Sequence, residues 1–135
     1  MRILIIDDDP VGIEIVEMLL APLNAQIRRA CSGESGIEQA EVFDPDLILL
    51  DYLLPDLDGL QTTKALRKLT NKPILILSVL NDPVVLAKVL NQGADDFLVK
   101  PVSREILFAH INNLVRRAEI PRKKPQPLMI PIHPI

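Results

Sequence analysis

Aromatic residues and cysteine are scarce in this chain. Its 135 residues include no Trp, one Tyr, three Phe and one Cys. Because so few aromatic side chains are present, a buried core has to be built from Leu, Ile and Val. The single cysteine, Cys31, cannot form an internal disulfide, which is typical of proteins in a reducing compartment. We interpret Cys31 as an inert small side chain and not as a redox centre.

Long hydrophobic runs are also missing. The apolar stretches are far shorter than the roughly 20 residues that a membrane-spanning helix needs, and no charged-then-apolar leader precedes a cleavage site. Hydrophobic residues make up 48% of the chain and charged residues 24%, which is ordinary for a globular domain with a buried core. We therefore expect one cytoplasmic domain without a membrane partner.

Acidic residues outnumber basic ones except near the C-terminus. Residues 1–117 carry 12 basic and 17 acidic side chains, whereas residues 118–135 carry three basic and one acidic. An acidic body repels nucleic acid, so we expect no direct nucleic-acid partner. Five of the twelve prolines fall between Pro121 and Pro134, where neither a helix nor a strand can continue. The domain is predicted to cover residues 1–118, and residues 119–135 to be a proline-rich tail or a truncated linker.

Short apolar runs alternate with helix-like segments along residues 3–118. The runs Ile3–Ile6, Leu47–Leu50 and Ile74–Leu77 show no polar alternation, which is typical of strands covered on both faces of a parallel sheet. Gln26–Ala30, polar enough for an edge, and Asp96–Val99 are the other expected strands. Helical segments follow them, beginning near residues 10, 32, 59, 82 and 103. Five repeats of strand and helix, joined by right-handed crossovers, predict an α/β fold with a doubly wound parallel sheet.

Charged and hydroxyl side chains stand directly after four of the expected strands. Asp7 and Asp8 follow the first strand, Asp51 the third, Ser78 the fourth and Lys100 the fifth. Since the carboxyl ends of parallel strands share the edge at which ligands bind, these side chains should meet. Adjacent carboxylates repel unless a cation intervenes, and Mg²⁺ suits a set of oxygen ligands. A carboxylate nucleophile beside a metal and a lysine is the equipment for phosphoryl transfer that gives an aspartyl phosphate.

The same positions belong to a larger set of motifs. The set comprises Ile3–Pro10, Asp46–Asp51, Pro55, Asp58–Gly59, Ser78 and Gly93–Pro101. Together these motifs resemble the receiver domain of response regulators in two-component signalling, over residues 1 to about 118. The resemblance implies a five-stranded, flavodoxin-like (βα)5 fold with strand order 2-1-3-4-5. It also implies a protein that takes a phosphoryl group from a histidine kinase or histidine phosphotransfer protein, with Mg²⁺ as cofactor, and then changes a binding surface.

Carried over position by position, the resemblance assigns roles to the residues at this edge. It implies Asp51 as the phosphoacceptor, with Ser78 and Lys100 holding the phosphoryl group. It implies as Mg²⁺ ligands Asp8 and Asp51 directly, Asp7 mainly through water, and the backbone carbonyl of Leu53. On this interpretation the chain catalyses only its own phosphorylation and dephosphorylation and is not an enzyme acting on other substrates.

A switch is implied at Ser78 and Phe97. In such a switch the aromatic side chain turns inward when the hydroxyl residue moves toward the phosphoryl group. Phe97 stands where the family often has Tyr. Because Phe97 has no hydroxyl that would hold it in water, we expect it to favour the inward position even without phosphate.

Two surfaces are expected to bind partners. On the first helix, Val11 and Ile15 either pack in the core or flank the acidic edge, where the family docks its kinase or phosphotransfer partner. The fourth helix, fifth strand and fifth helix form the expected face for an output domain or partner. On the fourth helix, Leu86 and Leu90 are expected to cover the sheet and Val84 to be exposed.

The last helix differs from one branch of the family. Ile106 and His110 stand where the winged-helix transcription factors have a Glu and an Arg that pair across a dimer. A homodimer of that charged type is therefore not expected, while a homodimer of another kind stays an open alternative. We interpret both histidines, His110 and His133, as solvated side chains without a metal or a phosphoryl group.

Three other functions remain as alternatives. A receiver-like domain can act as an interaction module without phosphorylation, although the full set of site residues argues against this. A Mg²⁺-dependent phosphatase with an aspartyl intermediate needs a second carboxylate two residues after the nucleophile, where this chain has Leu53. A nucleotide or flavin module is disfavoured because no glycine-rich phosphate loop follows the first strand.

Overall fold

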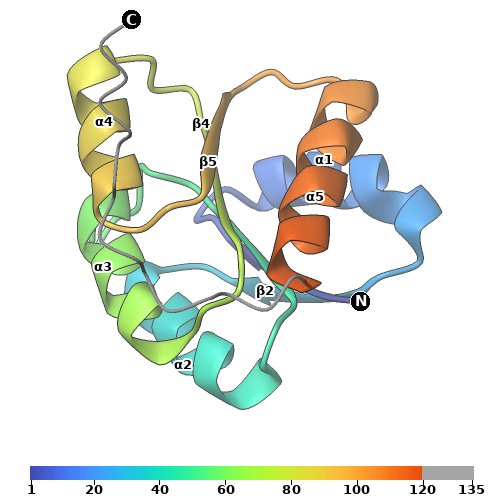
Figure 1. The fold of residues 1–135 in the computed structure, drawn as a ribbon, viewed down its shortest axis with the longest axis horizontal. Helices are drawn as coiled ribbons and strands as arrows, with labels where there is room; N and C mark the ends of the chain where they lie inside the picture. Colours follow the sequence, from blue (N-terminus) through green and yellow to red (C-terminus); the bar gives the residue numbers. More distant parts are fainter. Residues whose placement is uncertain (120–135) are drawn as a thin grey trace, which may run out of the picture.

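Strands and helices alternate along residues 1–119, the part of the chain that the computed structural model describes (Figure 1). The strands are β1 (Arg2–Ile6), β2 (Gln26–Ala30), β3 (Leu47–Leu50), β4 (Ile74–Ser78) and β5 (Asp96–Val99). The helices are α1 (Pro10–Leu20), α2 (Gly33–Phe43), α3 (Gly59–Leu69), α4 (Pro83–Asn91) and α5 (Arg104–Glu119), with a 3-10 helix η1 (Ala21–Leu23) after α1. The predicted alternation of strands and helices is confirmed.

Within residues 1–119, the five strands form one parallel sheet in the order β2-β1-β3-β4-β5. β1 lies inside the sheet, and the pairing of Ile6 with both Ala30 and Leu50 aligns the carboxyl ends of three strands. All residues of β3 and β4 are buried, as continuous apolar runs predict. The strand order and direction confirm the expected doubly wound, flavodoxin-like α/β fold, and they bring the carboxyl ends of β1, β3 and β4 side by side.

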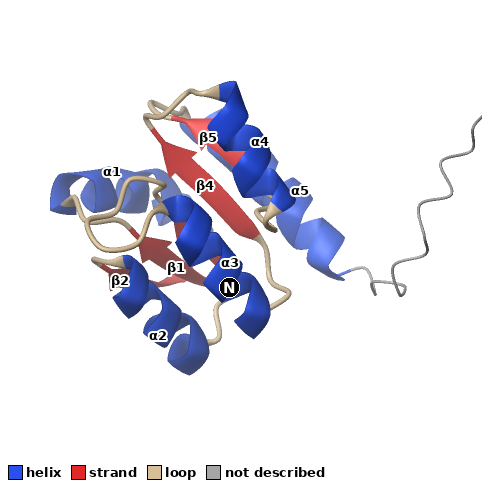
Figure 2. Ribbon diagram, turned by 90° about the vertical axis from the view of Figure 1, so that its left-hand side faces the viewer, coloured by secondary structure: helices blue, strands red, loops and turns tan. Residues whose placement is uncertain are grey.

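Two helical layers cover the sheet, with α1 and α5 on one face and α2, α3 and α4 on the other (Figure 2). Successive residues of a strand point to opposite faces. In β1, Ile3 and Ile5 pack in the core under α1 and α5, whereas Leu4 and Ile6 pack in the core under the other layer. Leu, Ile and Val make up most of both cores, as the shortage of aromatic residues predicts.

Polar side chains at the strand–helix junctions fix where the helices begin. Asp9 accepts a hydrogen bond from the Val11 N–H at 3.1 Å, and the Ser32 hydroxyl accepts one from the Ser35 N–H at 3.0 Å. Asp82 caps α4 in the same way. Each cap satisfies an N–H group that the first helical turn leaves without an intrahelical partner. The capped helices therefore start next to the carboxyl edge of the sheet.

The orientation of α4 differs from the prediction. Val89 is buried and Val85 packs half-buried against the core, while Leu90 is 43% exposed. The prediction that Leu86 and Leu90 cover the sheet is therefore wrong for Leu90, while Leu86 is half-buried and Val84 is exposed as expected. The physical reason is that α4 is apolar nearly all round, so its sequence does not define which side faces the core.

Several expectations concern the C-terminal part of the chain. Residues 120–135, which include the proline-rich tail and His133, lie outside the described residues. The last helix, α5, runs to Glu119, the last described residue. The predicted domain boundary at residue 118 therefore stays a prediction. Within residues 1–119, no helix is both long enough and apolar enough to cross a membrane.

Candidate functional site

The predicted site residues meet at the carboxyl edge of the sheet. Asp7 and Asp8 follow β1, and Asp51 follows the neighbouring strand β3. A carboxylate oxygen from each of these three residues lies within 4.8 Å of the others. Lys100, which follows β5, reaches the same place. We call these four residues the acid pocket.

The three carboxylates of the acid pocket differ in exposure. Asp7 is buried, Asp51 is half-buried and Asp8 is exposed. Hard divalent cations prefer such oxygen donors, and the exposed side of the cluster leaves room for the waters that Mg²⁺ keeps. The three carboxylates are therefore chemically suited to bind Mg²⁺. The structure brings them together as expected.

Lys100 bridges two of the acids. Its Nζ lies 3.1 Å from Asp7 Oδ2 and 3.5 Å from Asp51 Oδ2. Burial lowers the pKa of Lys100, but the charge of Asp51 and the hydrogen bond to Asp7 outweigh it, so the net pKa is raised. The ammonium group thus stays charged beside the carboxylates. The peptide bond between Lys100 and Pro101 is cis.

Asp51 is held at the end of β3 but is only partly neutralised. The Leu53 N–H donates to Asp51 Oδ1 at 3.0 Å. Burial has the largest effect and raises the pKa of Asp51; the hydrogen bond from Leu53 and the charge of Lys100 lower it, while the charge of Asp7 raises it. The net pKa remains above its usual value. The carboxylate therefore lacks the solvation that water would give it and would gain from a further positive charge.

Asp7 is fixed by the start of α1. Its Oδ1 accepts a hydrogen bond from the Asp9 N–H at 3.0 Å. A Cβ at Gly12 would lie only 3.1 Å from Asp7 Oδ2. The first turn of α1 therefore approaches the acid closely, and Gly12 suits this approach because it has no side chain.

Ser78 and Phe97 lie on the strands beside the acid pocket. Ser78 is buried at the end of β4, its hydroxyl accepts a hydrogen bond from the Leu80 N–H at 3.3 Å, and its backbone carbonyl accepts one from the Lys100 N–H. Ser78 ends β4, the strand next to β3 in the sheet, and Asp51 directly follows β3; hydrogen bonding by Ser78 slightly lowers the pKa of Asp51. Phe97 is half-buried and packs against the core under α4.

An apolar groove opens next to the acid pocket. It has a volume of about 310 Å³ and runs between α1 and the segment after β5, with Ile15, Val79, Lys100 and Val102 among its lining residues. Ile15 and Val11 on α1 are both exposed, so the alternative that they pack in the core is wrong. The groove shares Lys100 with the acid pocket and therefore extends the site into an apolar surface.

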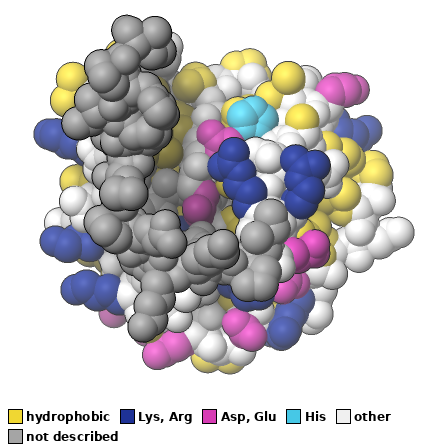
Figure 3. All heavy atoms as spheres, viewed as in Figure 1, with side chains coloured by type: hydrophobic (Ala, Val, Ile, Leu, Met, Phe, Trp, Pro, Cys, Tyr) yellow, Lys and Arg dark blue, Asp and Glu magenta, His cyan; other side chains and the backbone are white. Residues whose placement is uncertain are grey.

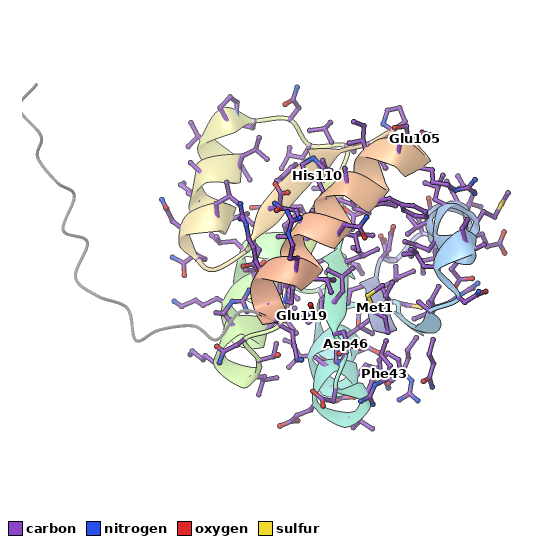
Figure 4. All side chains as sticks on the ribbon, turned by 45° about the vertical axis from the view of Figure 1, so that its right-hand side comes forward. Met1, Phe43, Asp46, Glu105, His110 and Glu119 are labelled. Atoms are coloured by element: carbon purple, nitrogen blue, oxygen red, sulfur yellow. The ribbon has the colours of Figure 1, made fainter. Side chains whose placement is uncertain are left out.

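Two features of the structure were not predicted. Asp56, in the loop after β3, accepts hydrogen bonds from the Gly33 and Glu34 N–H groups at the start of α2. His110 on α5 is not a free side chain, because its Nδ1 contacts Asp96 Oδ2 on β5; Figure 4 shows it on the side of α5 toward that strand. Both pairs join residues that are distant in sequence, and no local pattern indicates such a contact.

Comparison with known proteins gives one family for most of the chain. Residues 3–112 match the family model of the response regulator receiver domain. The transcriptional regulatory protein AfsQ1 of Streptomyces coelicolor is 36% identical over 117 residues, which cover 87% of this chain and 52% of AfsQ1. The cell cycle transcriptional regulator CtrA of Caulobacter vibrioides is 35% identical over 120 residues, 88% of this chain and 52% of CtrA. The chain thus spans about half the length of these relatives.

Solved structures agree with this match. A two-component response regulator from Clostridium difficile superposes with a TM-score of 0.84 at 33% identity, covering 88% of this chain and 98% of that structure. The chemotaxis protein CheY4 of Vibrio cholerae superposes with a TM-score of 0.78 at 25% identity, covering 84% of this chain and 97% of that structure.

Proposed function

The chain belongs to the response regulator receiver domain family, and on this basis we propose that it is the phosphoryl-accepting switch of a two-component phosphorelay. Its phosphoacceptor is Asp51, its cofactor is Mg²⁺ and its phosphodonor is a histidine kinase or a histidine phosphotransfer protein. The observation that carries the proposal is the acid pocket itself. Three carboxylates and one lysine, brought together from separate strand ends, leave Asp51 short of positive charge.

The proposed metal ligands are the carboxylates of Asp8 and Asp51 and the backbone carbonyl of Leu53, with Asp7 acting mainly through water. When bound, Mg²⁺ neutralises charge on the acids and on the phosphoryl oxygens. Lys100 would serve the same purpose as a cation of the chain itself, held between Asp7 and Asp51. The Ser78 hydroxyl would donate a hydrogen bond to a phosphoryl oxygen.

The proposed transfer of the phosphoryl group is an in-line displacement at phosphorus. An Asp51 oxygen attacks phosphorus and forms an O–P bond, while the N–P bond of the donor phosphohistidine breaks. The imidazole nitrogen of the donor keeps the electron pair of the broken bond. The lysine and the hydroxyl hold the three phosphoryl oxygens during the step. Hydrolysis of the resulting acyl phosphate returns Asp51 to a carboxylate and resets the switch.

The proposed switch joins Ser78 to Phe97. Ser78 and Phe97 lie on the adjacent strands β4 and β5, where Ser78 pairs with Val99 and Phe97 with Ile76. Movement of the buried hydroxyl toward the phosphoryl group frees space near β4 that the half-buried aromatic ring can fill. The inward preference of Phe97 stays a prediction.

The proposed donor-docking surface is the exposed part of α1 and the groove beside it. Val11 and Ile15 are exposed within one turn of each other, next to the acid pocket. A helix of the donor that covers these apolar side chains would bring its phosphohistidine to Asp51 and keep water away. The groove supports this because its apolar lining continues to Lys100.

The proposed output face is formed by α4, β5 and α5. Val84 and Ile106 are exposed there, and Figure 3 shows basic and acidic side chains interspersed on this side of the molecule. His110 pairs with Asp96 within the chain, so neither of these two groups is free for an ion pair with a partner, whereas Val84 and Ile106 offer apolar contacts. We propose that it binds an output segment or a partner protein, and a homodimer through it stays open. A cytoplasmic location also stays a prediction.

Intact-mass measurement after incubation with acetyl phosphate tests the proposal. The wild-type chain should gain the mass of one phosphoryl group in the presence of Mg²⁺, and the gain should be lost on mild alkaline treatment. Chelation of Mg²⁺ or the substitution Asp51→Asn should abolish it. An equal gain in Asp51→Asn would show that Asp51 is not the acceptor.

The same samples distinguish the alternatives. A Mg²⁺-dependent phosphatase would turn over a small phosphoester repeatedly, which we do not expect because Leu53 cannot act as a general acid. A chain that gains no labile mass under any condition, yet still binds a partner, would instead be an interaction module independent of phosphorylation.

A further inference from the structure

The loop between β3 and α3, residues 52–58, is tied down at three places. Near its start, the Leu53 N–H bonds to Asp51 Oδ1. At its base, the Gly59 N–H donates to the Tyr52 carbonyl at 2.8 Å, which closes the loop. The third tie lies at Asp56, at the far side of the loop, and it leads to a different helix.

Asp56 holds the N-terminus of α2 with both carboxylate oxygens. Oδ1 accepts from the Gly33 N–H at 2.8 Å and Oδ2 accepts from the Glu34 N–H at 2.9 Å. The next free N–H group, on Ser35, is satisfied by the Ser32 hydroxyl. Asp56 therefore supplies two of the three side-chain hydrogen bonds that complete the first turn of α2.

Packing and charge make this contact specific. A Cβ added to Gly33 would lie 2.9 Å from Leu57 Cβ and 2.7 Å from Thr62 Oγ1, so α2 touches both the loop and α3. The two N–H groups and the positive end of the helix dipole favour the ionised carboxylate of Asp56. Hydrogen bonds from the Glu34 and Gly33 N–H groups lower its pKa to about 2. The carboxylate is thus ionised over the whole physiological range.

We propose that Asp56 is a positioning residue of the phosphoacceptor site: by fixing the loop to α2, it holds the Leu53 carbonyl where Mg²⁺ is bound. The inference rests on the proposed function, because it assigns Asp56 a part in forming the same metal site. Asp56 is not one of the proposed ligands of the metal or of the phosphoryl group, because its carboxylate oxygens bond to the Gly33 and Glu34 N–H groups. Its role is to reduce the movement of a loop whose other ties lie close to Asp51 and at the base.

A Mg²⁺ titration followed by tyrosine emission tests this. Tyr52 is the one tyrosine of a chain without tryptophan, and it adjoins Asp51, so its emission reports on the site. Asp56→Ala should weaken Mg²⁺ binding by up to about tenfold, the lower end of the range for groups that bond directly to a ligand, because Asp56 acts on Leu53 only through the loop. Asp56→Asn, which keeps one acceptor oxygen, should fall in between. Gly33→Ala pushes α2 away from the loop and should weaken binding as well.

Ser32→Ala is the matched control. It removes a cap from the same helix but leaves the tie from Asp56 to the loop, so it should lower the stability of α2 without changing the affinity for Mg²⁺. Amide hydrogen exchange without metal gives a second readout. Exchange of residues 52–58 should become faster in Asp56→Ala and stay unchanged in Ser32→Ala.

Each outcome decides the question. Weaker Mg²⁺ binding and faster loop exchange in Asp56→Ala but not in Ser32→Ala support a positioning role. Equal Mg²⁺ affinity in wild type and Asp56→Ala, or equal exchange of the loop, overturns it while the proposed function stands. If the wild-type chain gives no response to Mg²⁺, the proposed function fails and the inference fails with it.

Discussion

Two clusters in this domain combine aspartate with a basic side chain, and they are built in opposite ways. The first is the acid pocket at the carboxyl edge of the sheet. The second, which we call the Arg67 network, joins the end of α3 to the start of β4 and to the segment between α4 and β5. Arg67 donates five hydrogen bonds, and its acceptors are the carbonyls of Gly93, Thr70 and Lys72 and the carboxylate of Asp95.

In the Arg67 network, charge and hydrogen bonds are matched. Arg67 Nη2 lies 2.7 Å from Asp95 Oδ2, and the same oxygen accepts from the Ile74 N–H at 2.8 Å. Gly93 has a φ of +120°, a conformation that side chains rarely adopt, and its carbonyl faces the guanidinium. A polar cluster that serves only the fold can be satisfied in full by the chain itself.

In the acid pocket, by contrast, three carboxylates lie close together and the one lysine contacts only two of them, Asp7 and Asp51. Burial raises the pKa of Asp51 most and the charge of Asp7 raises it further, and the charge of Lys100 does not offset them. Unlike the Arg67 network, the acid pocket therefore does not have the matched charges of a cluster that serves stability. On the proposed function, its unmatched negative charge would drive the uptake of a cation, and that cation would favour the arrival of a phosphoryl group.

Breaking the Arg67 network should have the largest effect on stability. Arg67→Ala removes a mostly buried cation and leaves carbonyls and Asp95 without their main donor, so we expect a loss of about 3 kcal/mol in the free energy of unfolding. Chemical denaturation measures this. Lys64→Ala, an exposed change on the same helix, should have little effect.

Phosphorylation of the Arg67→Ala variant shows whether the Arg67 network also affects the acid pocket. At a temperature where Arg67→Ala is still folded, its gain of mass from acetyl phosphate should match that of the wild type. If Arg67→Ala cost no stability, or if it abolished phosphorylation of the folded protein, the division between a structural and a functional cluster would be wrong.

The pH dependence of stability should have opposite signs at Asp51 and Asp56. The pKa of Asp56 is lowered from 3.8 to about 2 in the folded chain, so the unfolded chain binds protons more readily there. The stability contributed by Asp56 is therefore complete above pH 3.8 and is lost as the pH falls toward about 2. For Asp51 the pKa is raised, so the folded chain binds the proton more readily. That stability is present in acid and is lost as the pH rises through the folded pKa.

Denaturation of the two Asn variants in metal-free buffer measures this. At neutral pH the free energy of unfolding of the wild type should exceed that of Asp56→Asn, and this difference should shrink as the pH falls. At neutral pH, Asp51→Asn should be more stable than the wild type, because it removes a partly buried charge next to Asp7. This difference should also shrink as the pH falls. A less stable Asp51→Asn at neutral pH would mean that the acid pocket carries no unmatched charge.

Much of the fold and of the acid pocket could be predicted from the sequence, because both depend on order along the chain. Continuous apolar runs define the buried strands, and parallel strands must end at one edge. Asp7, Asp51 and Lys100 follow such runs directly, so their meeting needs no knowledge of side-chain packing. The shortage of aromatic residues likewise sets the composition of the core.

Contacts that depend on the rotation of a helix about its axis, or on residues distant in sequence, could not be predicted. The sequence of α4 is apolar on nearly every side, so the choice of Val85 and Val89 over Leu90 follows from packing alone. The pairing of His110 with Asp96 has the same origin.

Acidic residues in loops at both ends of the sheet have hydrogen-bond partners that the sequence does not indicate. Asp56 bonds to groups 22 and 23 residues away. At the amino end of the sheet, the Arg2 N–H bonds to Asp46, in the region where Figure 4 labels Met1, Phe43 and Asp46. In each case an acid in a loop could serve a helix, a strand or a ligand, and only the folded arrangement selects one of them.

The most direct test of the unmatched charge in the acid pocket is the free energy of unfolding with and without Mg²⁺, in wild type and in Asp51→Asn. A ligand that binds only the folded chain stabilises it by about 2.7 kcal/mol at one hundred times its dissociation constant. We predict a rise of this size for the wild type and a much smaller one for Asp51→Asn. No rise in the wild type, or an equal rise in both, would contradict the account.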